Sequence, residues 1–168
     1  MEYSERGVPL EPYGSGYYFE EMTIGKKWRT FARTIMEADM IAFCNCTGIT
    51  SELFCNTEYQ KNESVMAGRP VPGAFAYTLC EGFGGQGPIR GTGLSLLNVE
   101  LNIMAPVFIG DTIHCEVEVI ESRESRSRDD SGLVRFKQDI VKHDGSIPIS
   151  YRTLRLIKRK HKRGEVAA

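Results

Sequence analysis

Two alternating segments joined by a short turn constrain the fold of this chain more than any other feature. In each segment every second residue is apolar: Leu97, Val99, Leu101 and Ile103 in the first, and Ile113, Cys115, Val117 and Val119 in the second. A side-chain period of two is typical of strands that bury one face. We therefore predict two half-buried antiparallel strands, with the turn between them in APVFIGD.

The rest of the chain predicts further strands, with helices between the first strand and the others. LVRFKQDIV and IPISYRTLRLIK have strand character and are separated by the turn HDGS, while KKWRTFARTI supplies an earlier strand after Gly25. The order is one strand, then helices, then four strands, with local connections throughout. This order predicts an α+β domain in which a helix covers one face of an antiparallel sheet.

The first predicted helix lies in IMEADMIAF. Thr34 followed by Glu37 has the spacing of a capping box, which predicts that the helix begins here. Met36, Met40 and Phe43 recur at the spacing of one helix face, and Ile41 lies next to them. We expect these four apolar side chains to face the core.

The second predicted helix starts near Pro72-Gly73 and runs through AFAYTLCEGF. It has small and apolar residues on several faces, so we expect it to be buried nearly all round. The glycines that follow formally match the dinucleotide fingerprint G-x-G-x-x-G: Gly82, Gly84 and Gly87. That fingerprint follows a strand and opens a helix, whereas this stretch follows a helix and opens a strand. We interpret it as a helix C-terminus and loop.

Composition and charge restrict the class of protein. The chain has 168 residues, 41% of them hydrophobic, and a formal net charge of −1, which suits one globular domain and gives no reason to expect nucleic acid as a partner. No apolar stretch is long enough to span a bilayer, and the N-terminus lacks the apolar region of a signal peptide, so we expect a cytoplasmic protein without a membrane partner. We divide the chain into an extended arm (1–16), one domain (17–158) and a basic tail (159–168).

The cysteines invite a metal site. Cys44 and Cys46, with Cys55 as a third candidate ligand, lie in and just after the first predicted helix. Positions two apart on a helix point about 200° away from each other, so the first two thiols cannot chelate one ion. We expect no metal, and we expect the five cysteines, an odd number, to be reduced and buried.

The sequence resembles the MaoC-like hydratases and dehydratases in several of these segments. The resemblance runs from YYFEEMTIGKKW through TIMEADMIAF and the helix at Gly73 to GTGLSLLNVELNIMAPVFIGDTIHCEVEVIESRESRS. Its most specific part is the turn with Pro106, Gly110, Asp111 and Thr112. It implies a single hotdog fold, in which an antiparallel sheet wraps around a long buried helix. It also implies a coenzyme A thioester as ligand, no separate cofactor, and a homodimer or higher assembly.

The resemblance further implies where an active site would lie. In this family a loop of the form S-G-D-x-N-P-x-H carries the catalytic aspartate and histidine, and here Ile49 and Phe54 occupy those two positions. Both catalytic side chains are therefore absent, although the glycine at the head of the buried helix is retained. The implied substrate pocket comprises Ser51, Gly73 and Ala74.

Two glutamates are the candidates for substitute chemistry. Glu52 lies in the same loop and would serve as a single acid–base group if apolar neighbours tuned it; otherwise it is a loop carboxylate in water. Glu81, on the buried helix, resembles the carboxylate that hotdog thioesterases place there; otherwise it is structural or faces solvent. The histidines are excluded as pocket bases because they fall on a polar strand face, in a turn and in the basic tail: His114, His143 and His161.

Three functions are compatible with this pattern. The leading hypothesis is a catalytically degenerate protomer that binds acyl-CoA, or the non-catalytic subunit of a heteromeric hydratase with a catalytic MaoC-like partner. The second is an active hotdog enzyme: an enoyl-CoA hydratase that uses Glu52, or an acyl-CoA thioesterase that uses Glu81. The third is a structural or ligand-sensing module. The basic tail is expected to be solvated. The alternatives are binding of an anion, such as the phosphates of coenzyme A, and a short localisation or nucleic-acid patch.

Overall fold

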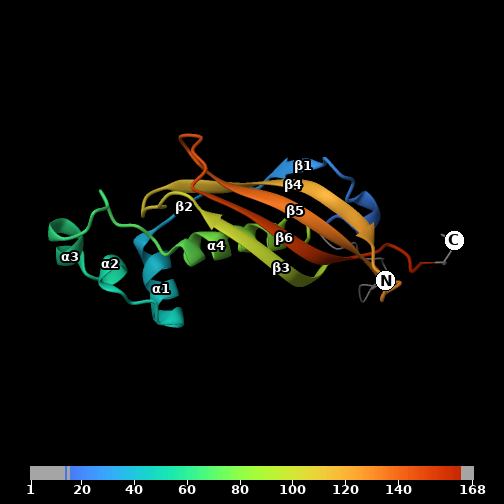
Figure 1. Ribbon diagram of the computed structural model, residues 1–168, viewed down its shortest axis with the longest axis horizontal. Helices are drawn as coiled ribbons and strands as arrows, with labels where there is room; N and C mark the ends of the chain where they lie inside the picture. The colour runs from blue at the N-terminus through green and yellow to red at the C-terminus, as the bar shows by residue number, and fades with distance from the viewer. Residues whose placement is uncertain (1–13, 15, 164–168) are drawn as a thin grey trace, which may run out of the picture.

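One antiparallel sheet forms the body of the computed structural model, which describes residues 14 and 16–163 (Figure 1). The strands are β1 (Lys27–Arg29), β2 (Arg33–Thr34), β3 (Gly93–Ile103), β4 (Thr112–Glu124), β5 (Ser131–Lys142) and β6 (Ile149–Lys158). Their order is β1-β4-β5-β6-β3, and β2 also pairs with β4. Most of the predicted N-terminal arm (1–16) lies outside the described residues.

The helices lie on one side of this sheet and beyond one of its ends. They are the 3-10 helix η1 (Phe19–Glu21) and the α-helices α1 (Glu37–Thr47), α2 (Glu52–Cys55), α3 (Thr57–Asn62) and α4 (Gly73–Gln86). In Figure 1, α4 runs beneath the sheet, whereas α1, α2 and α3 extend past its left end. The α+β architecture expected from the sequence is therefore confirmed.

The alternation in the second segment is confirmed, but the pairing of the two segments is not as predicted. Every apolar residue of β4 that we expected inside is buried: Ile113, Cys115, Val117 and Val119. β3 does not pair with β4; it crosses to the far edge and pairs with β6, where Ile103 lies opposite Ile149. The connections are thus not all local, because β4 takes β5 as its neighbour and leaves β3 at the edge of the sheet.

Two predictions of burial are wrong for the single chain. β3 is exposed on its apolar side, with Leu101 at 38% and Ile103 at 54% exposure, because only β6 pairs with it. α4 buries one side only, through Phe75, Ala76, Cys80 and Phe83. Small residues on its other side, Ala74, Thr78 and Gly82, are exposed.

The glycine-rich end of α4 is confirmed as a helix end. Gly82 and Gly84 lie within the helix, and Gly87 is its C-terminal cap, with its N–H donating to the Gly84 carbonyl. The dinucleotide interpretation therefore has no strand before these glycines to support it.

The start of α1 differs from the prediction. Met36 is the N-terminal cap, and its N–H donates to the carboxylate of Asp39 over 3.0 Å. The capping box from Thr34 to Glu37 is wrong, because the Thr34 hydroxyl instead bonds the Thr112 hydroxyl across the β2–β4 pair, at 2.7 Å. Of the apolar residues expected inside, Met40 is buried and Phe43 packs against the core, whereas Met36 and Ile41 are exposed.

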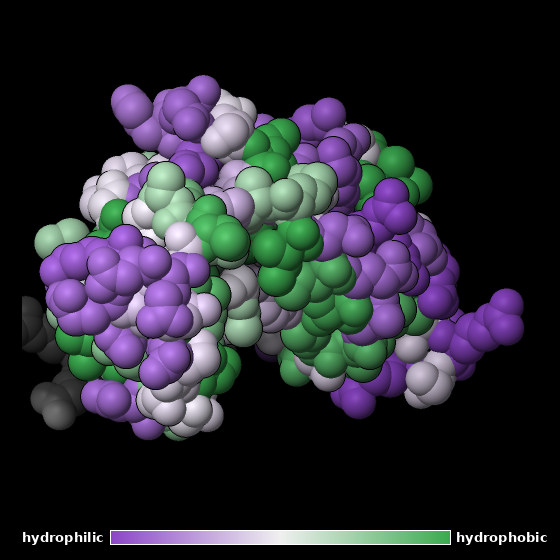
Figure 2. Space-filling view, turned by 60° about the vertical axis from the view of Figure 1, so that its left-hand side comes forward, coloured by the Kyte–Doolittle hydropathy of each residue, from purple (hydrophilic) through white to green (hydrophobic). Residues whose placement is uncertain are grey.

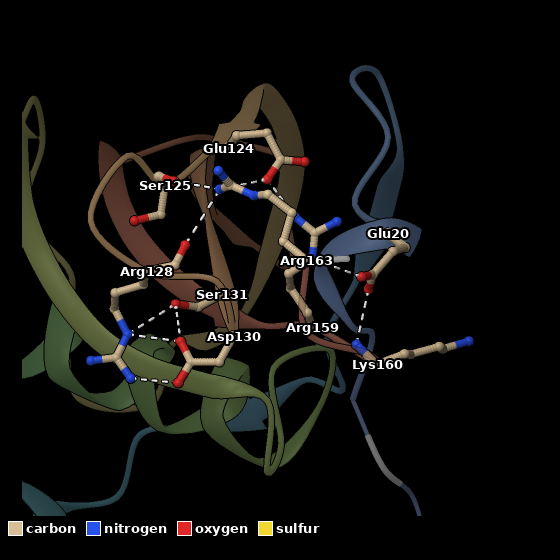
Figure 3. A network of polar contacts seen from close by, with 9 residues as sticks. All are labelled: Glu20, Glu124, Ser125, Arg128, Asp130, Ser131, Arg159, Lys160 and Arg163. Carbon is tan, nitrogen blue, oxygen red and sulfur yellow. Dashed lines mark hydrogen bonds and ion pairs between the residues drawn. The ribbon is translucent and has the colours of Figure 1, made fainter. Parts of the chain in front are cut away.

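The first half of the basic tail is not a freely solvated segment. Figure 3 shows Arg159 and Arg163 converging on Glu124, at the end of β4, and Arg159 also pairs with Glu20 of η1 at 3.2 Å. Arg163 donates to the Ser125 carbonyl at 2.5 Å, so the tail also holds the β4–β5 turn. The hydrogen bond from Arg159 lowers the pKa of the Glu124 carboxyl. Arg159 is half-buried, whereas residues 160–163 are exposed as expected of a solvated tail, and residues 164–168 lie outside the described part.

Candidate functional site

A cleft of about 210 Å³ opens at the N-terminal end of α4. Its lining residues are apolar or glycine: Leu53, Phe54, Met66, Pro70, Val71, Gly73, Ile103, Ala105, Pro106, Val107 and Ile149. Among the described residues that form its wall, none has a titratable side chain. The cleft therefore suits an aliphatic group and offers no side-chain acid or base.

A short backbone pairing fixes where α4 begins. The Val71 N–H donates to the Val107 carbonyl at 2.8 Å, and the Ile109 N–H donates to the Arg69 carbonyl at 3.2 Å. Pro72, with a φ of −53°, then caps the helix. Proline at a helix start is favourable because its fixed φ suits the first turn and no N–H is lost. The first peptide groups of α4 are thereby held at the cleft.

α2 brings Phe54 to the same place. Gly48 ends α1 in the left-handed conformation at a φ of +73°, and Ser51 precedes the first residue of α2. The guanidinium of Arg69 donates from Nε and Nη2 to the Phe54 carbonyl, at 3.3 and 3.2 Å. The same guanidinium pairs with Glu37 of α1. One side chain thus ties α2 to α1 beside the cleft.

The short helices α2 and α3 were not predicted from the sequence. A signal for α3 was present, because Asn56 is an N-terminal cap whose side-chain oxygen accepts from the N–H groups of Glu58 and Tyr59, at 3.0 and 3.1 Å. Asparagine before a short polar run is a typical helix start.

The structure brings only part of the implied pocket together. Phe54 and Gly73 both line the cleft. Ile49 is half-buried in the loop between α1 and α2, and Ser51 and Glu52 are exposed at the start of α2. Ala74 is exposed in the first turn of α4. Of the site residues proposed from the sequence, the described cleft wall contains only Phe54 and Gly73.

A residue that sequence reasoning missed, Ile103, contacts the start of α4. A Cβ built at position 73 would overlap Ile103 Cδ1 and would lie 3.4 Å from Cγ1. Glycine is therefore the residue that lets Ile103 pack directly on the backbone here. Peptide N–H groups in a first helical turn have no acceptor within the helix, and the helix dipole favours negative charge near them.

Glu81, a residue of α4, takes part in a separate polar network between this helix and the sheet. Its carboxylate pairs with Arg155 of β6 and accepts a hydrogen bond from Gln138 of β5 at 3.3 Å. Gln138 also donates to the Tyr151 hydroxyl at 3.0 Å, and burial raises the pKa of that hydroxyl. The carboxylate is thus engaged in joining α4 to the sheet.

The cysteines divide into two groups. Cys44, Cys80 and Cys115 are buried, and burial raises the pKa of the Cys44 thiol. The prediction of burial is wrong for Cys46 and Cys55, which are exposed on α1 and α2. Within the described residues, no three His, Cys, Asp or Glu side chains gather closely enough to hold a metal ion. Nor does that part of the chain contain a helix long and apolar enough to cross a membrane.

Comparison with known proteins identifies the fold. No known family profile matches the sequence, and no curated protein is significantly similar to it. Among solved structures, the MaoC-like dehydratase from Rhodospirillum rubrum is 19% identical, covering 87% of this chain and 99% of its own, with a TM-score of 0.78. The (R)-hydratase PhaJ1 from Pseudomonas aeruginosa is 18% identical, covering 92% and 96%, with a TM-score of 0.74.

A third structure supplies the name of the architecture. A Mycobacterium tuberculosis protein with a double hotdog fold is 15% identical, covering 90% of this chain and 47% of its own, with a TM-score of 0.77. The chain is therefore a hotdog protein, and it has the architecture of the MaoC-like dehydratases and (R)-hydratases. The single hotdog fold expected from the sequence is confirmed.

Proposed function

We propose that this chain binds the acyl group of a coenzyme A thioester in the cleft at the head of α4 and does not hydrate it. The observation that supports this proposal is the composition of the described cleft wall, which is apolar throughout and includes Phe54. Phe54 stands where the resembling family has its catalytic histidine. The cleft offers apolar walls to an acyl chain and no side chain for proton transfer.

Hydration of a 2-enoyl thioester requires more than a binding pocket. A base must take a proton from water and an acid must deliver one to the α-carbon, and such help contributes about 10²- to 10⁴-fold per group. Glu52 is exposed and does not line the cleft. Glu81 is engaged with Arg155 and Gln138. What remains is the set of backbone N–H groups at the start of α4, which would bind the thioester carbonyl without side-chain chemistry.

We further propose that the protein works as an assembly, either with a second copy of itself or with a catalytic homologue. β3 has one edge paired with β6, and four of its apolar residues outside the cleft are exposed: Leu94, Leu96, Leu97 and Leu101. Figure 2 shows hydrophobic residues gathered on one face of the molecule. An open, apolar edge strand is a template for pairing with another strand. The double hotdog fold of one structural neighbour supports pairing of two such units.

Calorimetric titration of the purified protein with butyryl-CoA tests the binding proposal, with free coenzyme A as the control. The proposal predicts saturable binding of the thioester and much weaker binding of free coenzyme A, since the cleft contributes only when an acyl chain fills it. In parallel, crotonyl-CoA absorbance should decay no faster than in buffer. Decay that Glu52→Gln abolishes would instead indicate an active hydratase, and absence of binding would leave a structural module.

A further inference from the structure

We infer that Ile103 is a gate over the start of α4, and that its side chain controls whether the carbonyl oxygen of an acyl thioester reaches the backbone there. This inference rests on the proposed function, because it concerns access to the same cleft. It assigns a specificity-determining role to a residue outside the loop and helix head that the family resemblance points to.

The contact between Ile103 and Gly73 is the first observation. Ile103 is the last residue of β3, and its side chain reaches across to the first residue of α4. The outer carbon Cδ1 is the atom that a Cβ at position 73 would meet first, with Cγ1 and Cγ2 farther away at 3.4 and 3.7 Å. The end of the isoleucine side chain therefore lies against Gly73, in the first turn of the helix that an incoming carbonyl oxygen would have to approach.

The exposure of this side chain is the second observation. Ile103 is 54% exposed, whereas its cross-strand neighbour Ile149, which also lines the cleft, is buried. Rotation about χ1 or χ2 between staggered wells would move Cδ1 off Gly73 at little packing cost. The opposite wall is constrained, because Arg69 holds the backbone of Phe54. The cleft thus has one fixed wall and one movable wall.

The consequence for a ligand follows from hydrogen-bond geometry. A carbonyl oxygen must come within about 2.7–3.2 Å of a backbone nitrogen to accept from its N–H. With Cδ1 on Gly73 this approach is closed, and with Cδ1 rotated away it is open. A shorter side chain at 103 would leave the helix start open permanently, and a larger one would keep it closed.

Two substitutions of opposite effect test the gate. Ile103→Val removes the Cδ1 methyl group alone, and Ile103→Phe enlarges the side chain. Ile24→Val is the matched control, since it makes the same change at an exposed isoleucine that lies neither on β3 nor in the cleft wall. Affinity for butyryl-CoA is measured by calorimetry, and thermal unfolding verifies that each variant is folded.

The inference predicts that Ile103→Val binds butyryl-CoA about tenfold more tightly than the unsubstituted protein and that Ile103→Phe binds it about tenfold more weakly. Ile24→Val should bind like the unsubstituted protein. A purely structural role at position 103 would weaken binding in both variants. If the unsubstituted protein binds and Ile103→Val binds equally well, the gate is wrong and the proposed function stands. If no variant binds the thioester, the proposed function is wrong and the gate with it.

Discussion

Arg69 donates two hydrogen bonds to the backbone carbonyl of Phe54 while pairing with the carboxylate of Glu37. The planar guanidinium is suited to such a double role because its N–H groups form a rigid fork. This relationship explains how a helix of four residues, α2, stays in place beyond the end of the sheet. It also makes Arg69 the residue on which the fixed wall of the cleft depends.

Replacement of Arg69 should therefore loosen α2. We expect Arg69→Ala to lower the free energy of unfolding by roughly 1–2 kcal/mol, because two hydrogen bonds from a charged group are lost. Arg69→Lys should recover only part of this loss, since an ammonium group lacks the fork. Urea unfolding monitored by circular dichroism measures both variants. Equal stability of Arg69→Ala and the unsubstituted protein would show that the fork is not what holds α2.

The packing of Ile103 on Gly73 predicts an energetic coupling between the two positions. Gly73→Ala should destabilise the protein, because the added Cβ overlaps Ile103 Cδ1. In the Ile103→Val background the same substitution should cost less by at least about 0.5 kcal/mol, which is the usual lower limit for residues in contact. Urea unfolding of both single variants and the double variant gives the coupling. Strict additivity of the two effects would mean that the contact does not exist in solution.

The pair formed by Glu81 and Arg155 is nearly buried, with side-chain exposures of 17% and 12%. Removing one partner leaves an uncompensated charge in a poorly solvated place, so Glu81→Leu and Arg155→Leu should each destabilise by about 3 kcal/mol. The double variant should be more stable than either single one. Thermal unfolding tests this order, and butyryl-CoA affinity should stay unchanged in the double variant. Loss of butyryl-CoA binding there would point to a ligand role for the pair.

The tail contact predicts a pH dependence of stability. The hydrogen bond from Arg159 lowers the folded-state pKa of Glu124 from its ordinary value of 4.5. A lowered carboxyl pKa stabilises the fold above the ordinary pKa, and that stability is lost as the pH falls through the lowered value. Stability should thus fall more steeply below pH 4.5 in the unsubstituted protein than in Arg159→Gln.

Arg126→Gln, at an exposed position in the same β4–β5 turn, is the control for this experiment. Urea midpoints measured across the acid range should follow the unsubstituted protein in the control and diverge from it in Arg159→Gln. Parallel pH profiles for all three proteins would show that the Arg159–Glu124 contact does not contribute to stability in solution.

The sequence was sufficient to predict those helices and strands whose residue pattern is local. The period of two in β4 identified its buried residues, and small apolar residues after Pro72 identified α4. The partner of β3 was not predictable in this way, because a strand's neighbour depends on contacts distant along the chain. Several residues that were expected inside are exposed, among them Leu97, Leu101 and Ile103 of β3 and Ile41 of α1. The periodicity of a sequence does not say which surface will cover such residues.

The candidate site, like the fold, was predicted only in part. The resemblance placed Phe54 and Gly73 together, and the structure does bring both to one cleft. It did not indicate Ile103, whose approach to Gly73 arises only because β3 ends beside the start of α4. Nor did it show that Glu81 would be engaged by Arg155, a partner 74 residues away along the chain.

The central claim is that the cleft binds an acyl thioester and leaves it unchanged, and a single-turnover experiment tests it most directly. Protein in excess is mixed with crotonyl-CoA, protein-bound and free ligand are separated by rapid filtration, and both fractions are analysed by mass spectrometry. The account predicts intact crotonyl-CoA in the protein-bound fraction. A product heavier by one water would contradict it in favour of a hydratase, and free coenzyme A would contradict it in favour of a thioesterase.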